Sequence, residues 1–206
     1  MAPNYALARR MYEGLAPGYD RRVRAVEGVR REAVSLLGLK AGDTVLDIGC
    51  GTGLSFPLLV EGVGPEGTIV GVDVSGDMLA KARERVDASR WKNVTLVQSA
   101  IEDAEISVEA DAVLFHFTHD IMRTPAALDN VFRHVRPGGG VVSAGGKWAP
   151  WWLGPVNLVW WRISRRYVTT FEGYRKPWSH LTTWVADLEV RPRMLGGVYV
   201  AWGRRR

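Results

Sequence analysis

The sequence predicts an α/β fold built on a doubly wound, mostly parallel, seven-stranded sheet. Three features of the chain favour this class. Short apolar segments rich in β-branched residues alternate with segments whose apolar residues have helical spacing. A glycine-rich turn follows the first of these strands, and an acidic residue ends the second. Strands that alternate with helices at this interval are joined by crossovers, which place the strands parallel.

The middle of the chain supplies most of the expected elements. We expect strands at residues 45–48, 68–74, 94–97, 112–117 and 140–144, and helices at residues 56–61, 76–86 and 126–135. After residue 146 this alternation stops for about forty residues. Residues 188–195 and 197–202 then predict two final strands joined at a Gly-Gly turn, and this terminal hairpin sets one antiparallel strand into the sheet.

The chain is expected to form a single domain over residues 1–206. Its 206 residues, 47% of them hydrophobic, suffice for one substantial core and are few for two. No apolar run reaches the roughly 20 residues of a membrane-spanning helix. Charges interrupt the N-terminus where a secretory signal needs an apolar block. We therefore expect a cytoplasmic protein, in which the single Cys50 has no partner for an internal disulfide.

The net charge of +5 is unevenly distributed along the chain. Residues 1–40 carry eight basic and four acidic groups, and residues 147–206 carry eleven basic and three acidic groups. Residues 41–146 instead carry eight basic and fifteen acidic groups. The two flanks, rather than the centre, therefore suit an anionic partner.

The first predicted strand leads directly into a glycine-rich loop. Its sequence is DIGCGTG, in which Asp47 precedes Gly49, Gly51 and Gly53. Glycines at such a turn let the backbone approach a ligand closely. Asp73 ends the next strand, where a carboxylate can accept both hydroxyls of a ribose. A carboxylate just before the glycines would repel a pyrophosphate, so the loop suits a cationic ligand better than a dinucleotide.

Three motifs together resemble the class I S-adenosylmethionine-dependent methyltransferases of the small-molecule type. They are VLDIGCGTG at residues 45–53, IVGVDVS at 69–75 and VRPGG at 135–139. The resemblance covers roughly residues 5–144 and, more loosely, the terminal hairpin. It implies a Rossmann-like fold, S-adenosylmethionine as cofactor and S-adenosylhomocysteine as product.

The resemblance also implies how the single domain is divided. Residues 1–40 are expected to form an N-terminal helical lid, with two helical pieces separated by Ala16-Pro17-Gly18. Residues 41–146 would be the cofactor-binding core and residues 147–187 a tryptophan-rich substrate lid, ahead of the hairpin at 188–206.

Cofactor-binding residues follow from the resemblance position by position. They are Asp47, Gly49, Cys50, Gly51, Gly53, Asp73, Val74, Met78, Ile101, Glu102, His116 and Phe117. The segment VQSAIED departs from the family pattern, because Ala100 stands where an acidic residue often holds the adenine amino group. Glu102 or Asp103 is expected to substitute. Met78 also fits an apolar helix stripe, and Cys50 also fits a small filler in the loop.

The cofactor itself makes the transferred methyl group reactive, so the protein chiefly has to align an acceptor and exclude water. A general base is needed only where the acceptor holds a proton. His119, with its neighbour Asp120, follows the fourth predicted strand and titrates in a suitable range. Tyr19, like Tyr12, lies in the expected N-terminal lid, where its ring could cover a sulfonium. We expect no metal, since the four histidines show no paired-ligand motif.

Five tryptophans lie in KWAPWWLGPVNLVWW, residues 147–161. A helix at 155–167 would align one apolar stripe while its arginines project elsewhere, and a second helix is expected to start at Pro177. The expected stripe is Val156, Val159, Trp160, Ile163 and Tyr167. Three interpretations stay open for this segment: a lid that walls an apolar acceptor pocket, an interfacial helix on anionic lipid, or the filling of a core or dimer interface.

The predicted function is the transfer of a methyl group to an O or N atom of a small, largely apolar or aromatic acceptor. A membrane-associated enzyme acting on a phospholipid or lipophilic quinone is an alternative, with peripheral contact to an anionic membrane. A non-catalytic S-adenosylmethionine-binding partner protein is another. No motif for nucleic-acid substrates is visible, and both a monomer and a homodimer remain open.

Overall fold

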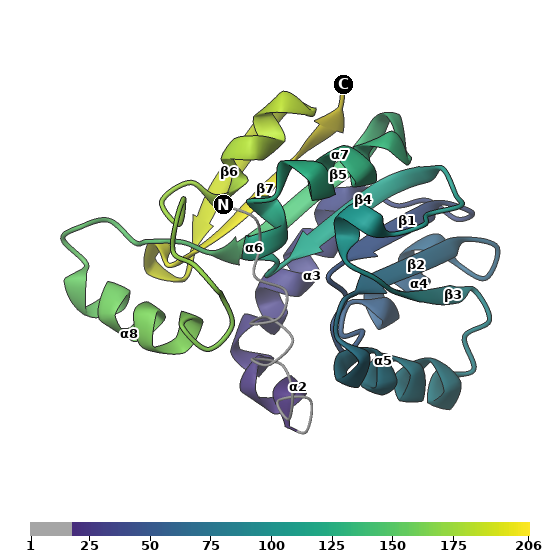
Figure 1. Cartoon of the computed structure of the whole chain (residues 1–206), viewed down its shortest axis with the longest axis horizontal. Helices are drawn as coiled ribbons and strands as arrows, with labels where there is room; N and C mark the ends of the chain where they lie inside the picture. The colour runs from purple at the N-terminus through teal and green to yellow at the C-terminus, as the bar shows by residue number, and fades with distance from the viewer. Residues whose placement is uncertain (1–17) are drawn as a thin grey trace.

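The computed structural model describes residues 18–206 (Figure 1). The first expected helical piece, with Tyr12, lies outside the described residues. The described chain forms one seven-stranded sheet in the order β3-β2-β1-β4-β5-β7-β6. The strands are β1 (Thr44–Ile48), β2 (Thr68–Asp73), β3 (Val94–Gln98), β4 (Ala110–His116), β5 (Val135–Gly146), β6 (Val185–Arg193) and β7 (Val198–Arg205).

The sheet confirms the predicted fold class. Strands β1 to β5 pair in parallel, and β7 lies antiparallel between β5 and β6. Both β5 and β6 are longer than predicted. Strand β5 begins to pair with β4 at Val135, ahead of a register shift on β4. Strand β6 begins before Asp187, whose φ of 48° lies at an irregularity in the pairing with β7. Such bulges interrupt the apolar alternation that a sequence pattern follows.

Alternate residues of the central strands enter two different cores. Val45 packs with α3 (Glu27–Leu37), α4 (Phe56–Val63) and α5 (Gly76–Ser89). Leu46 and Ile48 pack on the other face with α7 (Pro125–Arg133) and two 3-10 helices, η2 (Ile101–Asp103) and η3 (Pro177–Thr183). A parallel sheet covered on both faces explains why its strands read as nearly continuous apolar runs.

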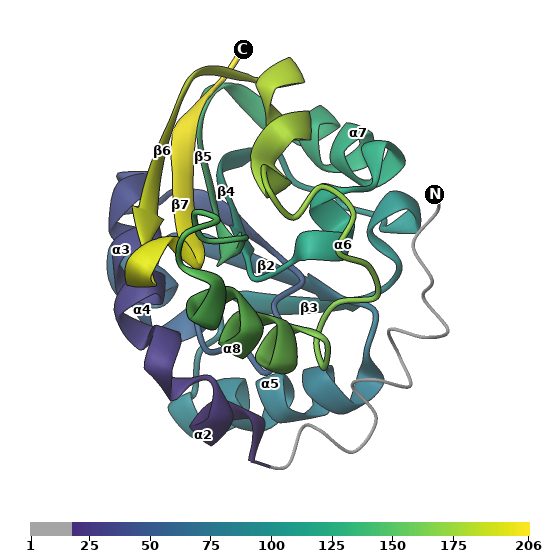
Figure 2. The same ribbon diagram turned by 90° about the vertical axis from the view of Figure 1, so that its left-hand side faces the viewer.

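Three further segments border the carboxyl ends of the parallel strands. The N-terminal part of the described chain forms α2 (Tyr19–Arg22) and η1 (Arg24–Val26) ahead of α3, and α6 (His119–Met122) follows β4. Helix α8 (Gly154–Ser164) stands out from the body at the left of Figure 1 and faces the viewer in Figure 2. It ends three residues before the predicted limit, and the predicted second helix is the 3-10 helix η3.

Candidate active site

The glycine loop after β1 has the backbone that its sequence predicts. Gly49, Gly51 and Gly53 all have positive φ, at 70°, 56° and 73°. A Cβ on Gly49 would lie 2.5 Å from Thr118 Cγ2, so this glycine lets the loop after β4 approach β1. A Cβ on Gly51 would meet no atom of residues 18–206 within 4 Å. Among the described residues the loop therefore has open space beside its middle glycine, as a ligand cradle requires.

Asp73 lies at the end of β2 and holds the glycine loop. Its Oδ2 accepts a 2.8 Å hydrogen bond from the Gly51 amide, and its Oδ1 accepts one of 2.9 Å from the Ser75 amide. Burial raises the pKa of this carboxyl, and the backbone hydrogen bonds oppose that rise. The carboxylate predicted for ribose recognition thus lies directly against the glycine loop.

Asp47 lies in β1, two residues before the first glycine of the same loop. It is 2% exposed, and its Oδ2 has no hydrogen-bond partner within the described residues. Burial raises its pKa to about 7, the Arg30 guanidinium acts to lower it, and the Asp73 carboxylate acts to raise it. A buried carboxylate oxygen without a donor fits a cationic group such as the ammonium of S-adenosylmethionine.

Arg30 is a site residue that sequence reasoning missed. It is buried on α3, forms an ion pair with Glu27, and influences the pKa values of Asp47, His116 and Tyr19. One sequence feature marks it: Arg30 falls on the apolar stripe of its helix, among Val26, Ala33 and Val34. A charged residue on a core-facing stripe usually has a specific partner.

The remaining predicted cofactor residues lie in the glycine loop, after β2 and in the segment after β3. Cys50 and Met78 are buried, Val74 is half-buried beside Asp73, and Glu102 lies in η2 beside Ile101. Ile101 is buried in the core under α7. The buried Asn130, which sequence reasoning missed, donates to the carbonyl oxygens of Ile101 at 2.8 Å and Ala104 at 2.9 Å. It therefore fixes the loop expected to lie beside the adenine.

A network joins α2 to the glycine loop. Asp20 accepts a 2.7 Å hydrogen bond from the Thr52 hydroxyl and a 2.6 Å bond from Arg85 Nη2. Arg85 Nε also donates to the Thr52 carbonyl at 3.0 Å. The described part of the N-terminal segment is therefore joined to the glycine loop.

A cavity of about 650 Å³ lies between α2, η1, α3, the ends of β4 and β5, and α8. Its walls are mostly apolar. They include the whole predicted α8 stripe, and the lining residues used below are Tyr19, Arg30, His116, Phe117, His119, Val156, Val159, Trp160, Ile163, Tyr167, Tyr174, Met194 and Leu195.

His116 and Phe117 end β4 at the cavity. Phe117 has a φ of 59°, which is uncommon for a side chain of this size, and its amide donates to the Ala144 carbonyl at 2.6 Å. Burial and, to a smaller extent, the Arg30 guanidinium lower the pKa of His116 to about 3, so its ring is neutral. His116 Nε2 is buried without a partner within the described residues.

His119 also lines the cavity, and its surroundings fix its tautomer. Its Nε2 lies 3.1 Å from the Glu172 carbonyl oxygen, which can only accept, so Nε2 carries the proton. Its Nδ1 then holds a free lone pair and is buried without a partner among the described residues. Burial lowers the pKa of His119, while Asp120 and the Glu172 carbonyl oppose the shift. The ring packs edge-on against Tyr174 at 5.0 Å.

The other two predicted catalytic residues, Tyr19 and Asp120, differ in their position relative to the cavity. Tyr19 lines the cavity and packs edge-on against Tyr167 at 6.1 Å, and burial raises its pKa to about 12. Its hydroxyl is therefore a neutral donor. The structure does not place Asp120 in the cavity wall. Its Oδ2 accepts a 3.0 Å hydrogen bond from the Thr169 amide and so holds the loop after α8.

The five tryptophans of residues 147–161 have different environments. Trp148 stacks on Phe171 at 5.3 Å, and Trp160 lines the cavity. Trp151, Trp152 and Trp161 are exposed. Over residues 18–206 no three His, Cys, Asp or Glu side chains gather where they could hold a metal ion, and no helix is both long and apolar enough to cross a bilayer.

Comparisons with known proteins agree with this geometry. Residues 39–151 match the model of a methyltransferase domain family. The demethylmenaquinone methyltransferase of Symbiobacterium thermophilum is 30% identical over 156 residues, which are 68% of this chain and 62% of that protein. The chain therefore spans less than two thirds of this relative's length.

One solved structure has the same fold over nearly the whole chain. It is the N-methyltransferase NodS from Bradyrhizobium japonicum in complex with S-adenosylhomocysteine. The TM-score is 0.69 at 17% identity, with 96% of this chain and 98% of that one covered. A second relative, the arsenite methyltransferase of Halobacterium salinarum, is 32% identical over 105 residues, 48% of this chain and 26% of that protein.

Proposed function

Because this chain belongs to the class I S-adenosylmethionine-dependent methyltransferase family, we propose that it methylates an O or N atom of a small, largely apolar acceptor held in the cavity. The observation that carries this proposal is the position of the cavity. It lies at the carboxyl ends of β4 and β5, at the edge of the sheet where open α/β folds hold their ligands, and its lining includes Arg30, whose guanidinium acts on the pKa of Asp47.

The cofactor half of the site rests on two carboxylates and three glycines. Asp73 accepts the ribose hydroxyls, and the orphaned Oδ2 of Asp47 faces the ammonium group. Gly49, Gly51 and Gly53 let the backbone approach the methionine moiety. When bound, S-adenosylmethionine supplies a methyl group on a sulfonium, which makes that carbon electrophilic.

The acceptor half excludes water and orients the reacting atom. The apolar stripe of α8, with Val156 and Trp160, packs against the acceptor from one side, and Phe117 at the end of β4 closes the other. An apolar wall of this kind favours a hydrophobic acceptor and strengthens polar contacts inside. The neutral Tyr19 hydroxyl is placed to donate a hydrogen bond to a polar atom of the acceptor.

His119 acts as general base where the acceptor is a hydroxyl or an ammonium. Its Nδ1 takes the proton that the acceptor loses, because Nε2 is committed to the Glu172 carbonyl. Its lowered pKa keeps the ring neutral and available at pH 7. Asp120 acts on His119 through its charge and through the loop that it holds at Thr169, and is thus a positioning residue.

A lipophilic quinone or a phospholipid is a second candidate acceptor. Two observations favour it: the mostly apolar cavity, and the similarity to proteins named demethylmenaquinone methyltransferases. Such an acceptor would keep its apolar tail along α8 while its polar head reaches His119.

Two measurements on the purified protein test the proposal. Calorimetry with S-adenosylhomocysteine tests the cofactor site, and transfer of a labelled methyl group to a panel of phenols, amines and a reduced demethylated naphthoquinone tests the acceptor. We expect binding and transfer to at least one apolar acceptor. Absence of binding contradicts the cofactor site, whereas binding with no transfer to any acceptor supports the alternative of a non-catalytic cofactor-binding partner.

A further inference from the structure

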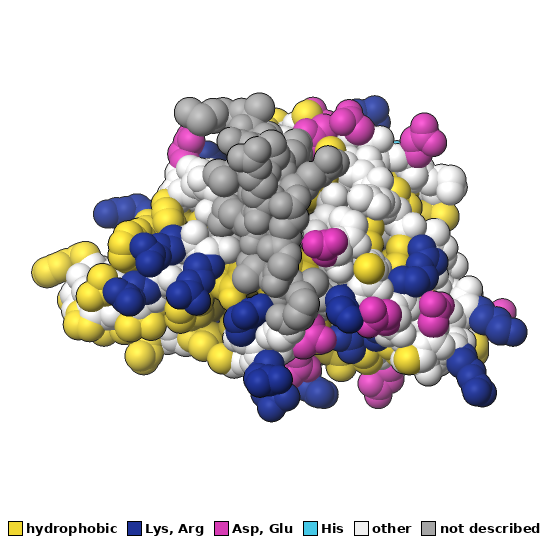
Figure 3. All heavy atoms as spheres, turned by 60° about the horizontal axis from the view of Figure 1, so that its bottom comes forward, with side chains coloured by type: hydrophobic (Ala, Val, Ile, Leu, Met, Phe, Trp, Pro, Cys, Tyr) yellow, Lys and Arg dark blue, Asp and Glu magenta, His cyan; other side chains and the backbone are white. Residues whose placement is uncertain are grey.

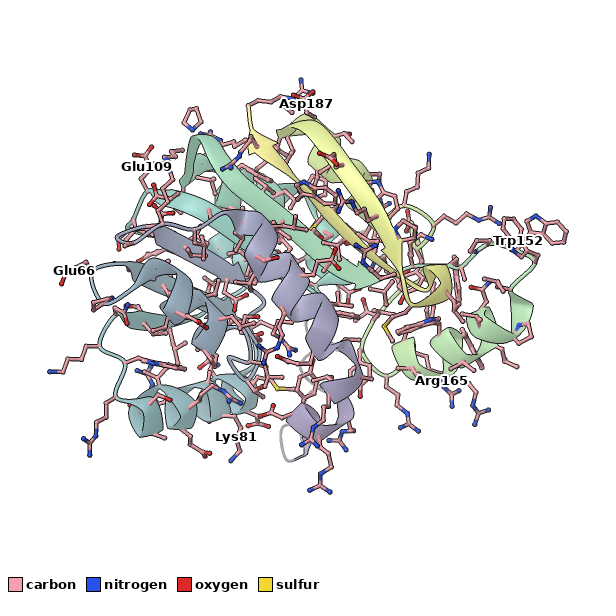
Figure 4. The ribbon with its side chains drawn as sticks, turned by 180° about the vertical axis from the view of Figure 1, so that it is seen from behind. Glu66, Lys81, Glu109, Trp152, Arg165 and Asp187 are labelled. Atoms are coloured by element: carbon pink, nitrogen blue, oxygen red, sulfur yellow. The ribbon has the colours of Figure 1, made fainter. Side chains whose placement is uncertain are left out.

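Helix α8, the turn that precedes it and the turn between β6 and β7 expose large apolar side chains on one side of the molecule. Trp151, Trp152 and Leu158 are 83%, 66% and 59% exposed, and Leu195 in the turn is 72% exposed. Figure 4 shows the Trp152 side chain pointing away from the body beyond the free end of α8. Side chains of this size seldom remain in water as a group without a partner.

The two exposed segments form one continuous surface. A Cβ on Gly197 in the turn would lie 1.7 Å from Trp160 Nε1, so the turn packs directly on α8. The Lys147 ammonium donates to the carbonyls of Trp148 at 2.7 Å and Gly196 at 2.9 Å, which ties the turn to the start of the tryptophan segment. The turn itself is strained, because Met194 and Leu195 both have positive φ.

Arginines border this apolar surface. Arg162 on α8 and Arg165 and Arg166 just after it are exposed, and the Arg165 guanidinium lies 5.0 Å from the centre of the Trp161 ring. Residues 150–166 contain these three arginines and no acidic residue. Figure 3 shows the blue cationic side chains among yellow apolar ones over this helix at the left. Exposed indoles beside arginines suit the headgroup region of a bilayer with anionic lipids.

The cavity opens onto the same surface. Four large apolar side chains both line the cavity and are exposed to solvent, namely Val159, Ile163, Met194 and Leu195. Arg22, Ala25 and Pro155 also line the cavity and are exposed. The rim is therefore mostly apolar and runs toward Leu158 and the two tryptophans at the tip, which favours entry of a lipophilic molecule that leaves a bilayer.

We propose that this surface, formed by Trp151, Trp152, Leu158, Trp161, Met194, Leu195 and the three arginines, docks on an anionic bilayer and turns the cavity mouth toward the lipid. The surface projects as a tip that carries indole rings beside cations, which suits insertion among lipids better than the flat core of a protein interface. The docking stands independently of methyl transfer. Entry of the acceptor from the bilayer rests on the proposed function.

The test is sedimentation of the full chain, with S-adenosylhomocysteine present, on phosphatidylcholine vesicles with and without phosphatidylglycerol. We expect selective binding to the anionic vesicles that weakens with salt. The double variant Trp151→Ala, Trp152→Ala should lose roughly tenfold or more in partition coefficient, because buried indole area is lost. Arg162→Gln with Arg165→Gln should lose about thirtyfold.

A matched control is Arg83→Gln with Lys92→Gln, which removes two exposed cations on and just after α5. It should bind as the wild type does. Sedimentation velocity without vesicles tests the other occupant, a second copy of the chain. Absent binding, equal binding to neutral vesicles, or a dimer that the tryptophan variant dissociates would each overturn the docking proposal.

Calorimetry with S-adenosylhomocysteine separates this proposal from the proposed function. All docking variants should retain the wild-type affinity for S-adenosylhomocysteine, because none of the substituted residues lies at the glycine loop. Loss of cofactor binding by the wild type would contradict the proposed function and leave the docking result standing.

Discussion

The Thr52 hydroxyl donates a 2.7 Å hydrogen bond to Asp20 Oδ1, which joins the glycine loop to the helix that precedes the core. Arg85 completes this junction from α5, so three separate segments meet at the loop that is proposed to hold the cofactor.

Asp20→Ala removes the two hydrogen bonds that Asp20 accepts at this junction, from Thr52 and from Arg85. We expect the affinity for S-adenosylhomocysteine to fall roughly threefold to tenfold, because a net hydrogen bond contributes about 1 kcal/mol and the loop loses its cover. Calorimetry measures this effect. Asp87→Ala, an exposed acid on the same α5 helix, is the control and should bind as the wild type does. Unchanged affinity in the Asp20 variant would mean that the junction does not order the cofactor site.

Asp73→Ala should weaken cofactor binding more strongly, by roughly tenfold to a hundredfold. The carboxylate is proposed to accept two ribose hydroxyls, and hydrogen bonds to a charged group contribute about 1.5 to 3 kcal/mol. Calorimetry with S-adenosylhomocysteine gives the affinity, and thermal melting monitors the loss of the bonds to Gly51 and Ser75. A variant that melts normally and binds with wild-type affinity would refute the ribose assignment.

The affinity for S-adenosylhomocysteine should depend on pH through Asp47. In the ligand-free protein its pKa is raised to about 7, so the carboxyl is increasingly protonated and neutral below that pH. An ammonium prefers the carboxylate, so binding must remove that proton. The dissociation constant should therefore rise toward tenfold per pH unit below about 7 and level off above it. Calorimetry between pH 6 and 8 measures the slope, which Asp47→Asn should abolish.

His119→Ala should slow methyl transfer while leaving cofactor affinity unchanged. General bases contribute roughly a hundredfold or more, and the loss should be largest for acceptors that hold a proton. The measurement compares turnover of a phenol or amine acceptor with calorimetric binding of S-adenosylhomocysteine. His134→Ala, a substitution remote from the cavity lining, is the control. Equal turnover by wild type and the His119 variant would leave His119 with a packing role against Tyr174.

Gly49→Ala should destabilise the fold by roughly 2 kcal/mol or more. Its φ of 70° is costly for a residue with a Cβ, and that Cβ would overlap Thr118. Gly28→Ala is the matched control, because Gly28 lies in α3 and no atom of residues 18–206 lies within 4 Å of its Cβ position, and it should stabilise the fold by about 0.5 to 1 kcal/mol. Urea unfolding measures both, and similar midpoints would contradict the strain argument.

The fold and the cofactor loop were predictable because each depends on local sequence. Strand and helix alternation gives the parallel sheet, and the glycines with Asp47 and Asp73 mark the loop. Arg30 was missed because its influence on Asp47 depends on how α3 packs on β1, 17 residues further along the chain. The direction of the Asp120 carboxylate, toward the Thr169 amide, likewise depends on a contact 49 residues away. Sequence spacing also could not show that Trp160 would lie under the turn while Trp161 remains exposed.

The proposed cofactor residues and the α8 side of the cavity come from different parts of the chain. Asp47, Asp73 and the glycines belong to β1, β2 and the loop between β1 and α4, whereas Val156, Trp160 and Leu195 come from segments that follow β5. Exchange of residues 147–197 alone would therefore replace that side of the cavity, while Tyr19, Phe117, His119 and the proposed cofactor residues stay in place. Such a division would let related chains diversify their acceptors by inheritance of one segment and replacement of the other.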